Sequence, residues 1–198
     1  MNLSDRVWKT VDGARSGIED LIAQGVLEGK SAVSLSKELT KYISGKPIEY
    51  KGELVKGKNL EYQSLRLAAT EMNIAFRTSD YLQNSRLPFV TGVQVFLSSS
   101  HPATDICDDM QGHYPKGFEF IGWHPSCICY AEYETLEIDD FAKYIETGEI
   151  DKSQFTTCIP DRAQKYLDKN GEKLLGYKNP PYWMDNFTKD LKLKDKIA

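Results

Sequence analysis

Residues 60–98 read LEYQSLRLAATEMNIAFRTSDYLQNSRLPFVTGVQVFLS, and the spacing of their apolar side chains changes once along this stretch. In the first part, small and apolar residues recur at steps of three and four, which predicts one long helix over residues 60–84. These residues are Leu65, Ala68, Met72, Ala75, Ser79 and Leu82. Residues 93–98 then alternate, with Val93 and Val95 on the same side, which predicts a strand. A long helix leading into a strand favours an α+β fold.

The stretch after this strand, residues 99–126, is rich in residues that interrupt helices and strands. They are Pro102, Gly112, Pro115, Gly117, Gly122 and Pro125. Residues 127–134 are again strand-like, and we expect them to pair with residues 93–98 in a small antiparallel sheet packed on the long central helix. The loop between the two strands must therefore be stabilised by something other than backbone hydrogen bonds within a sheet.

Outside this region the sequence predicts an N-terminal helical pair in residues 1–45, with Leu3 and Ser4 as a hydrophobic staple and cap. Ser31 can cap the second helix of the pair, and the polar residues 48–59 predict a loop.

Beyond the second strand, residues 139–146 and 161–169 predict two short helices. The last thirty residues, with two adjacent prolines and a lysine-rich end, predict a loosely attached tail. The predicted divisions are an N-terminal helical arm at 1–58, a core domain at 59–150 and a C-terminal extension at 151–198.

The composition limits the classes of function. The 198 residues are 40% hydrophobic, which is enough for a buried core, and the formal net charge is −4. Because the basic side chains are scattered along the chain, direct nucleic-acid binding is not expected. Every apolar run is shorter than the roughly 18 residues that a membrane span needs, and no signal-peptide pattern opens the chain. We therefore expect a soluble protein with no membrane partner.

The most specific pattern is a cluster of cysteine and histidine residues in the loop-rich segment, here called the Cys/His knot. His124, Cys127 and Cys129 form a His-x-x-Cys-x-Cys motif, and Cys107 lies seventeen positions before His124. Zinc prefers these ligand types, and a structural zinc would stabilise a loop that buries little apolar surface. The alternative is that the small cysteines simply pack in the core while His124 bonds a backbone carbonyl. Both interpretations fit the sequence.

Other patterns favour structure over catalysis. The motifs of zinc deaminases and metalloproteases are absent, and no carboxylate accompanies His124 at the spacing that those enzymes need. Asp105, Asp108 and Asp109 lack the spacing of a calcium loop and predict a solvated acidic turn. On the long helix, Glu71 borders the apolar stripe without a basic partner one turn away, and we expect it to anchor the loop of the Cys/His knot.

Two blocks of sequence occur in the order and at the separation seen in a known family. The first block consists of Arg66, Thr70, Glu71 and Asn73 on the long helix. The second block consists of Asp105, Cys107, Gly112, His124, Cys127 and Cys129. Together they resemble the phage Mu F-like minor head proteins, also called head-morphogenesis proteins, and the resemblance covers residues from about 20 to 135.

One departure from the family concerns the knot. Many members carry a Cys-x-x-Cys pair where this chain has Thr104 in place of the first cysteine. The leading ligand set is therefore Cys107, His124, Cys127 and Cys129, with His101 as a spare ligand.

The resemblance implies a non-enzymatic virion component that is associated with portal or capsid proteins and acts in head assembly or DNA passage. Such a protein lies in the phage head and, during assembly, in the host cytoplasm. Two other functions stay open at this point: a zinc-dependent hydrolase, and a phage-delivered effector resembling ADP-ribosyltransferase toxins.

Overall fold

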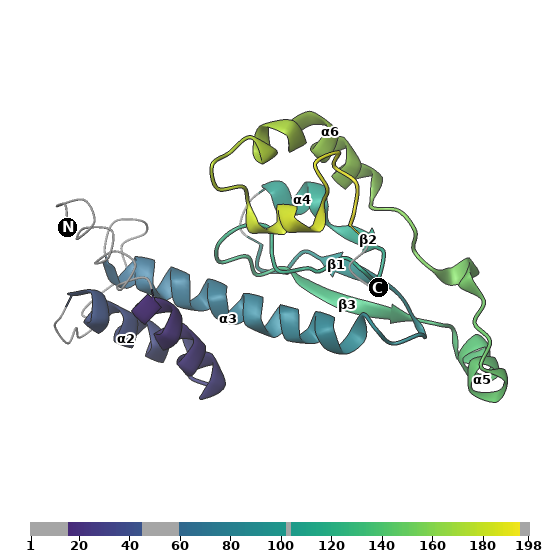
Figure 1. Ribbon diagram of the computed structural model, residues 1–198, viewed down its shortest axis with the longest axis horizontal. Coiled ribbons are helices and arrows are strands. Elements are labelled where there is room, and N and C mark those ends of the chain that lie inside the picture. Colours follow the sequence, from purple (N-terminus) through teal and green to yellow (C-terminus); the bar gives the residue numbers. More distant parts are fainter. Residues whose placement is uncertain (1–15, 45–59, 102–103, 195–198) are drawn as a thin grey trace, which may run out of the picture. The chain divides into compact units, whose positions relative to one another are not determined.

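The computed structural model describes residues 16–44, 60–101 and 104–194. The chain forms two compact units that divide between Ala75 and Phe76, inside the long helix α3 (Leu60–Asn84), whereas the predicted divisions fall near residues 58 and 150 (Figure 1). The predicted staple at Leu3 and Ser4 and the predicted loop at 48–59 lie outside the described residues.

The first unit is helical, and it confirms the predicted N-terminal pair. Residues 16–27 form one helix and α2 spans Ala32–Ser44. Ser31 caps α2 as expected, because its hydroxyl accepts a hydrogen bond from Ser34 N at 3.2 Å. Leu35 and Leu39 of α2 are fully buried and pack with Ala68 of α3 in a small core. Ala68 is thus buried in this core and Met72 packs against it, whereas Leu82, at the other end of the predicted stripe, is 55% exposed.

The second unit is built on a three-stranded antiparallel sheet in the order β2-β1-β3. Strand β1 spans Val90–Phe96, β2 spans Gly112–Tyr114 and β3 spans Tyr130–Thr135. The predicted pairing of the two longer strands is confirmed, with Val93 opposite Tyr133. Strand β2 was not predicted, because it has only three residues and lies in the segment rich in helix and strand breakers.

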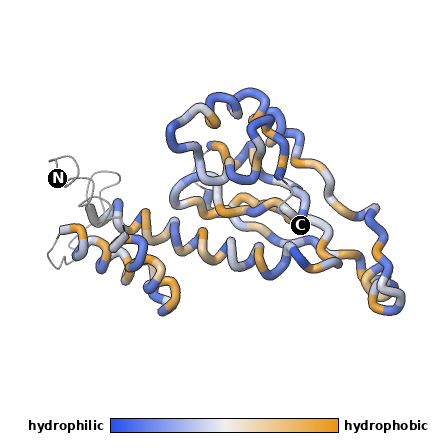
Figure 2. Tube along the Cα trace, in the orientation of Figure 1, coloured by the Kyte–Doolittle hydropathy of each residue, from blue (hydrophilic) through white to orange (hydrophobic). Residues whose placement is uncertain are grey.

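Several short helices complete the second unit. They are α4 (Ile106–Met110), α5 (Ile138–Thr147), α6 (Asp161–Leu175) and the 3₁₀ turns η1 (Lys152–Gln154) and η2 (Tyr182–Asn186). The two helices predicted after the sheet are confirmed as α5 and α6, although α6 continues six residues beyond its predicted end at 169. Figure 2 shows α6 as mostly hydrophilic, and its buried side is limited to Ala163, Leu167 and Gly171.

The core of the second unit is aromatic. Tyr114 and Phe118 stack with ring centroids 4.0 Å apart, and Trp123 meets Trp183 edge to face at 5.6 Å. Trp183 is 1% exposed. Rings in these arrangements stabilise a core beyond the area that they bury.

The predicted loosely attached tail is therefore wrong. The Asn186 side chain accepts a hydrogen bond from Glu119 N at 3.0 Å and donates one to Glu119 O at 2.9 Å. Trp183, Met184 and Phe187 are all buried in the core. The sequence did not reveal this because η2 is a single short turn, in which buried side chains follow no helical or strand period.

Candidate metal centre

Cys107 is positioned by a capping box at the start of α4. Asp105 Oδ1 accepts a hydrogen bond from Cys107 N at 2.7 Å, and Asp108 Oδ2 accepts one from Asp105 N at 2.8 Å. These two reciprocal bonds satisfy backbone donors at the helix start and fix the backbone at Cys107. The Cys107 side chain is fully buried.

A tight turn positions the other half of the Cys/His knot. Cys127 N donates to His124 O at 3.0 Å, and Ser126 adopts a left-handed backbone with φ of 62°. The turn folds Cys127 back toward the His124 ring. The two cysteines at 127 and 129 were predicted to lie in the second strand, but they precede β3 in irregular backbone. The turn from His124 to Cys127 leaves residues 127–129 in irregular backbone, so β3 begins three residues later than its apolar pattern suggested.

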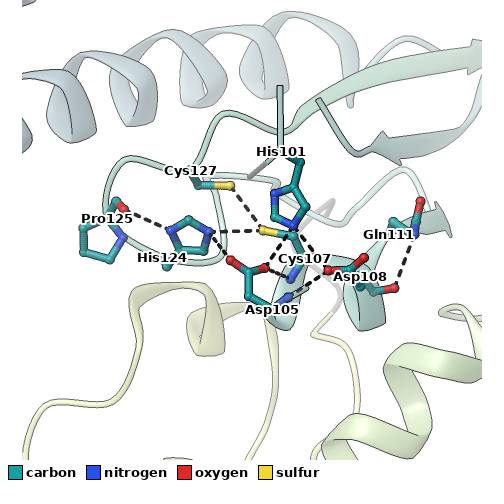
Figure 3. Close-up of polar contacts among 8 residues, drawn as sticks. All are labelled: His101, Asp105, Cys107, Asp108, Gln111, His124, Pro125 and Cys127. Carbon is teal, nitrogen blue, oxygen red and sulfur yellow. Dashed lines mark hydrogen bonds and ion pairs between the residues drawn. The ribbon is translucent and has the colours of Figure 1, made fainter. Parts of the chain in front are cut away.

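Three of the predicted ligands converge (Figure 3). Cys107 Sγ lies 3.2 Å from His124 Nε2 and 3.9 Å from Cys127 Sγ. The cysteine side chains are buried, with Cys107 0%, Cys127 2% and Cys129 1% exposed. For zinc with bonds of about 2.3 Å to sulfur and 2.0–2.1 Å to nitrogen, tetrahedral geometry places neighbouring ligand atoms about 3.5–3.8 Å apart. The observed separations are close to these values, so this triad fits a small tetrahedral metal ion.

The ring orientation of His124 also suits a metal. Its Nδ1 lies 2.9 Å from Pro125 O, the backbone carbonyl that can accept the Nδ1 proton. In that tautomer the lone pair of Nε2 points toward Cys107. The bond to a backbone carbonyl that the packing alternative expected is therefore present, and it is the same bond that prepares a histidine to bind metal.

Cys129 joins a second triad that includes His101. The ligand atoms of His101, Cys107 and Cys129 all lie within 4.8 Å of one another, as do those of Cys107, His124 and Cys127. Cys107 is common to both triads. His101 was predicted only as a spare ligand, whereas the structure places it with Cys129 on one side of Cys107.

The acidic residues near Cys107 do more than form the solvated turn that was predicted. His101 Nε2 lies 3.2 Å from Asp108 Oδ2 and 3.5 Å from Asp105 Oδ1, and His124 Nε2 lies 3.3 Å from Asp105 Oδ2 (Figure 3). No carboxylate accompanies His124 at the spacing of the zinc-enzyme motifs, but the fold places the Asp105 carboxylate beside its ring. Asp105 is brought there by the fold, because nineteen positions separate the two residues in the sequence.

The pKa values of the three buried thiols are shifted in different directions. Hydrogen bonds from the thiols of Cys107 and Cys129 lower the pKa of Cys127 well below its usual range. The pKa of Cys107 is raised, first by its hydrogen bond to Cys127 and then by the one to Cys129. One thiolate stabilised by neighbouring thiols is a suitable starting state for metal binding, in which the metal displaces the remaining protons.

Arg77 of α3 ties this helix to the knot, and the sequence did not single it out. Its guanidinium donates to Ile121 O at 3.1 Å, to Cys127 O at 2.9 Å and to Cys129 O at 2.5 Å. It also lies 4.8 Å from the centre of the Phe120 ring. A planar group with several fixed donors suits backbone carbonyls that no strand can pair. The available signal was an arginine that directly follows three apolar residues, 74–76, on the long helix.

The remaining motif residues lie in the first unit or in β2. The Thr70 hydroxyl donates to Arg66 O at 2.7 Å, one helical turn back, and Asn73 lies on the same helix. Glu71 makes no hydrogen bond or ion pair with the described residues, and burial raises the pKa of its carboxyl. Its anchoring of the knot loop stays a prediction.

Gly112 begins β2 with φ of +130°, a conformation that favours glycine. An added Cβ there would meet Pro160 at 2.8 Å. The family-like glycine is therefore explained by backbone conformation and close packing in this fold.

Among the described residues, no helix has the length and apolar content that crossing a membrane requires. Comparisons of the chain with models of protein families, with curated proteins and with solved structures found no match.

Proposed function

We propose that the chain is a bacteriophage minor head protein, a non-enzymatic virion component in which the Cys/His knot holds a structural zinc ion. One observation supports this proposal above the others. The two parts of the second family-like block, Cys107 on α4 and the segment that begins at His124, are seventeen positions apart in sequence, yet the side chains of His124 and Cys127 meet Cys107 in one triad whose sulfurs are buried. A shared motif whose residues converge is better explained by a common site than by chance spacing.

A structural role suits the ligand set better than a catalytic role. The predicted set supplies three buried sulfurs and one histidine, and a zinc ion bound by all four would have no position left for the water that a catalytic zinc activates. In the structure these ligands form two triads that share Cys107, so their closure on one ion is part of the proposal. When bound, the ion would link α4 to the turn before β3. It would thereby stabilise a loop in which few backbone groups are paired within strands.

The proposed partners are portal or capsid proteins of the phage, and the proposed location is the phage head. Docking of this kind needs a formed surface and no substrate chemistry. Direct nucleic-acid binding is not part of the proposal, because the chain is acidic overall and its basic residues are scattered.

Mass spectrometry of intact, purified particles from the source phage tests this function. We expect the protein to be present at a low and constant copy number relative to the portal protein. Particles assembled without the gene should be defective in head assembly or in DNA delivery. Absence of the protein from purified particles, together with normal particle yield and infectivity without the gene, would contradict the proposal.

A zinc hydrolase is the second candidate, and one contact favours it. Asp105 Oδ2 lies 3.3 Å from His124 Nε2, and the Asp105 side chain is 39% exposed, so this carboxylate could act as a general base beside a metal. In that case Asp105→Asn would keep the zinc and abolish turnover of a hydrolysable substrate. The docking proposal expects zinc-loaded protein to show no turnover that depends on Asp105.

A further inference from the structure

Two groups of metal-ligating side chains meet in the Cys/His knot, and one sulfur belongs to both groups. His124 and Cys127 form the first group with Cys107. His101 and Cys129 form the second group with the same cysteine. Within each group the ligand atoms lie within 4.8 Å of one another, at most about 1 Å more than neighbouring ligands of a tetrahedral zinc. A single ion would have to gather ligands from both groups, whereas two ions need only the groups as they stand.

The Asp105 carboxylate reaches both groups. Its Oδ2 lies 3.3 Å from His124 Nε2, and its Oδ1 lies 3.5 Å from His101 Nε2. Figure 3 shows the two imidazole rings approaching this carboxylate and the Cys107 sulfur from opposite sides. Neighbouring nitrogen and oxygen ligands of a four-coordinate zinc are about 3.3–3.5 Å apart when the bonds are near 2.0–2.1 Å. Each carboxylate oxygen is therefore placed to supply a fourth ligand to one group.

The start of α4 holds the two shared side chains in position. Asp105 Oδ1 accepts the N–H of Cys107 at 2.7 Å, and Asp108 Oδ2 accepts the N–H of Asp105 at 2.8 Å. An ionised carboxylate has about four lone-pair sites, so the oxygen that bonds the backbone can also bind a metal. Such hydrogen bonds orient a carboxylate ligand. One short segment thus presents a sulfur and a carboxylate that both groups can use.

Formal charge also favours two ions. The three thiolates and the Asp105 carboxylate together carry four negative charges, which two divalent ions would neutralise. One ion would leave two of these charges uncompensated beside sulfurs that are at most 2% exposed. Arg77 and Asp108, the nearest other charged side chains, cancel each other in this count. Uncompensated charge in a buried site is costly, so a second ion stabilises the ionised ligand set.

We propose that the knot binds two zinc ions that share the Cys107 thiolate and the Asp105 carboxylate, an inference that rests on the structural zinc of the proposed function. Each ion takes its other two ligands from one group, so Cys129 belongs to the second ion instead of closing on the first. In two-metal sites the ions lie about 3.5–4 Å apart. Each ion then has four protein ligands and no open position, so the centre stays structural.

Ion pairing without metal explains less of this geometry. A protonated His101 could pair with Asp108, whose Oδ2 lies 3.2 Å from His101 Nε2. Such pairing requires a carboxylate beside each ring, but it does not account for a sulfur that both rings share. A bridging thiolate does account for it, because each ion needs the same sulfur on its own side.

Native mass spectrometry of the full chain, stripped of metal and reloaded with zinc, counts the ions. We expect two zinc ions per chain in the parent, and one in His101→Ala and in His124→Ala, because each variant loses a ligand of one ion only. The matched control is His113→Ala. Its ring pairs with Glu134 at 2.8 Å outside the knot, so this variant should retain two ions. Circular dichroism checks that each variant folds, and the stoichiometry of the parent decides where one does not.

Cobalt provides a second measurement, since it substitutes for zinc and its thiolate bonds absorb light. The thiolate-to-cobalt band should grow until two equivalents have been added, because both ions bind sulfur. Cobalt held by surface carboxylates would add nothing to this band. Asp105→Asn still caps α4, because asparagine is a good N-cap, but it should weaken binding of both ions at least about tenfold. The hydrolase candidate instead expects this variant to keep its zinc.

The outcomes separate this inference from the proposed function. One equivalent in the parent, by mass and by the cobalt band, would overturn the second ion and leave the single structural zinc. No zinc at all would overturn both. Two ions that persist in His101→Ala and in His124→Ala would lie elsewhere, which also overturns the inference. The virion role is tested by mass spectrometry of particles, whose result does not depend on the number of ions.

Discussion

The aromatic core and the Cys/His knot lie next to each other in the second unit, yet they stabilise the same segment by different means. Tyr114, Phe118 and Trp123 bury large rings against Trp183, which the end of the chain supplies. The knot contributes small sulfurs and an imidazole, whose value depends on distances and protonation. The stabilisation gained by burying rings does not depend on their exact orientation, whereas polar contacts and metal ligands stabilise only at defined distances and angles. The comparison shows that a segment with little regular structure can be covered on one side by buried rings and can carry on the other a cluster of side chains whose geometry suits a metal ion.

The largest expected effect comes from the aromatic side. Replacing Trp183 with alanine should lower the free energy of unfolding by roughly 3–5 kcal/mol, because it leaves a cavity among packed rings. Thermal unfolding should then begin at least roughly 10 °C lower. The matched variant is Trp183→Phe. Trp183 Nε1 has no hydrogen-bond partner among the described residues, so this variant loses buried apolar area and no hydrogen bond. It should lower the free energy of unfolding by less than half as much as Trp183→Ala. Equal melting of Trp183→Ala and the parent would show that the core does not depend on the tail.

The next effect distinguishes the knot from the core. Removing zinc with a chelator should lower the stability of the second unit by about 2.7 kcal/mol if free zinc had been 100-fold above its dissociation constant. The helices of the first unit should persist in circular dichroism. Trp183→Ala and the chelator should act additively if the two sides are independent.

Substitution of cysteines supplies the control for this prediction. Cys107→Ser should lose zinc, because Cys107 belongs to both triads, while Cys158→Ser changes an exposed thiol outside the knot and should retain it. Zinc should also be released as the pH falls, since protons compete for thiolate and imidazole ligands. A parent protein with well under one equivalent of zinc by metal analysis, and with melting indifferent to chelator, would favour plain packing of the cysteines.

A smaller effect should come from the link between α3 and the knot. Replacing Arg77 with methionine keeps much of the apolar stem but leaves three backbone carbonyls without their charged donor. Hydrogen bonds to charged groups contribute about 1.5–3 kcal/mol, and we expect a loss in that range from denaturant unfolding. Arg77→Lys should recover part of it. Zinc content should stay at the parent level, because Arg77 donates to carbonyls and to no metal ligand atom.

The smallest effect concerns Glu71. Burial raises the pKa of its carboxyl above the usual value of 4.5, so the folded state binds the proton more tightly than the unfolded state. Its ionisation therefore costs stability as the pH rises through that range, and the cost is complete above the folded pKa. At pH 7 Glu71→Gln should melt at the same or a slightly higher temperature than the parent, and near pH 3 the two should match. A lower melting temperature at pH 7 would instead support the predicted anchoring of the knot loop.

The sequence predicted those parts of the molecule that carry a local period. Helix α3 has the predicted bounds of 60–84, and β1 pairs with β3 because alternating valines mark a buried face. The convergence of Cys107 with His124 and Cys127 was predictable from ligand type and spacing, together with the family resemblance.

The missed parts depend on partners far away in the sequence. Strand β2 is three residues long and exists because β1 offers it a free edge. Arg77 bonds carbonyls that lie 44 to 52 positions later, and Asp105 reaches His124 only through the capping box of α4. No window of local sequence contains either relationship, so pattern alone could not reveal them.

The hydrogen bonds of Asn186 to the backbone of Glu119 affect when the second unit can finish folding during translation. They join residues 67 positions apart, and Trp183 fills the core beside them. During synthesis at about 5–20 residues per second, the rings around residue 119 wait roughly 3 to 13 seconds before their last partners are made. Over that interval the nascent chain exposes aromatic surface that is prone to aggregate. We therefore expect this unit to complete its folding late and to bind ribosome-associated chaperones in the meantime.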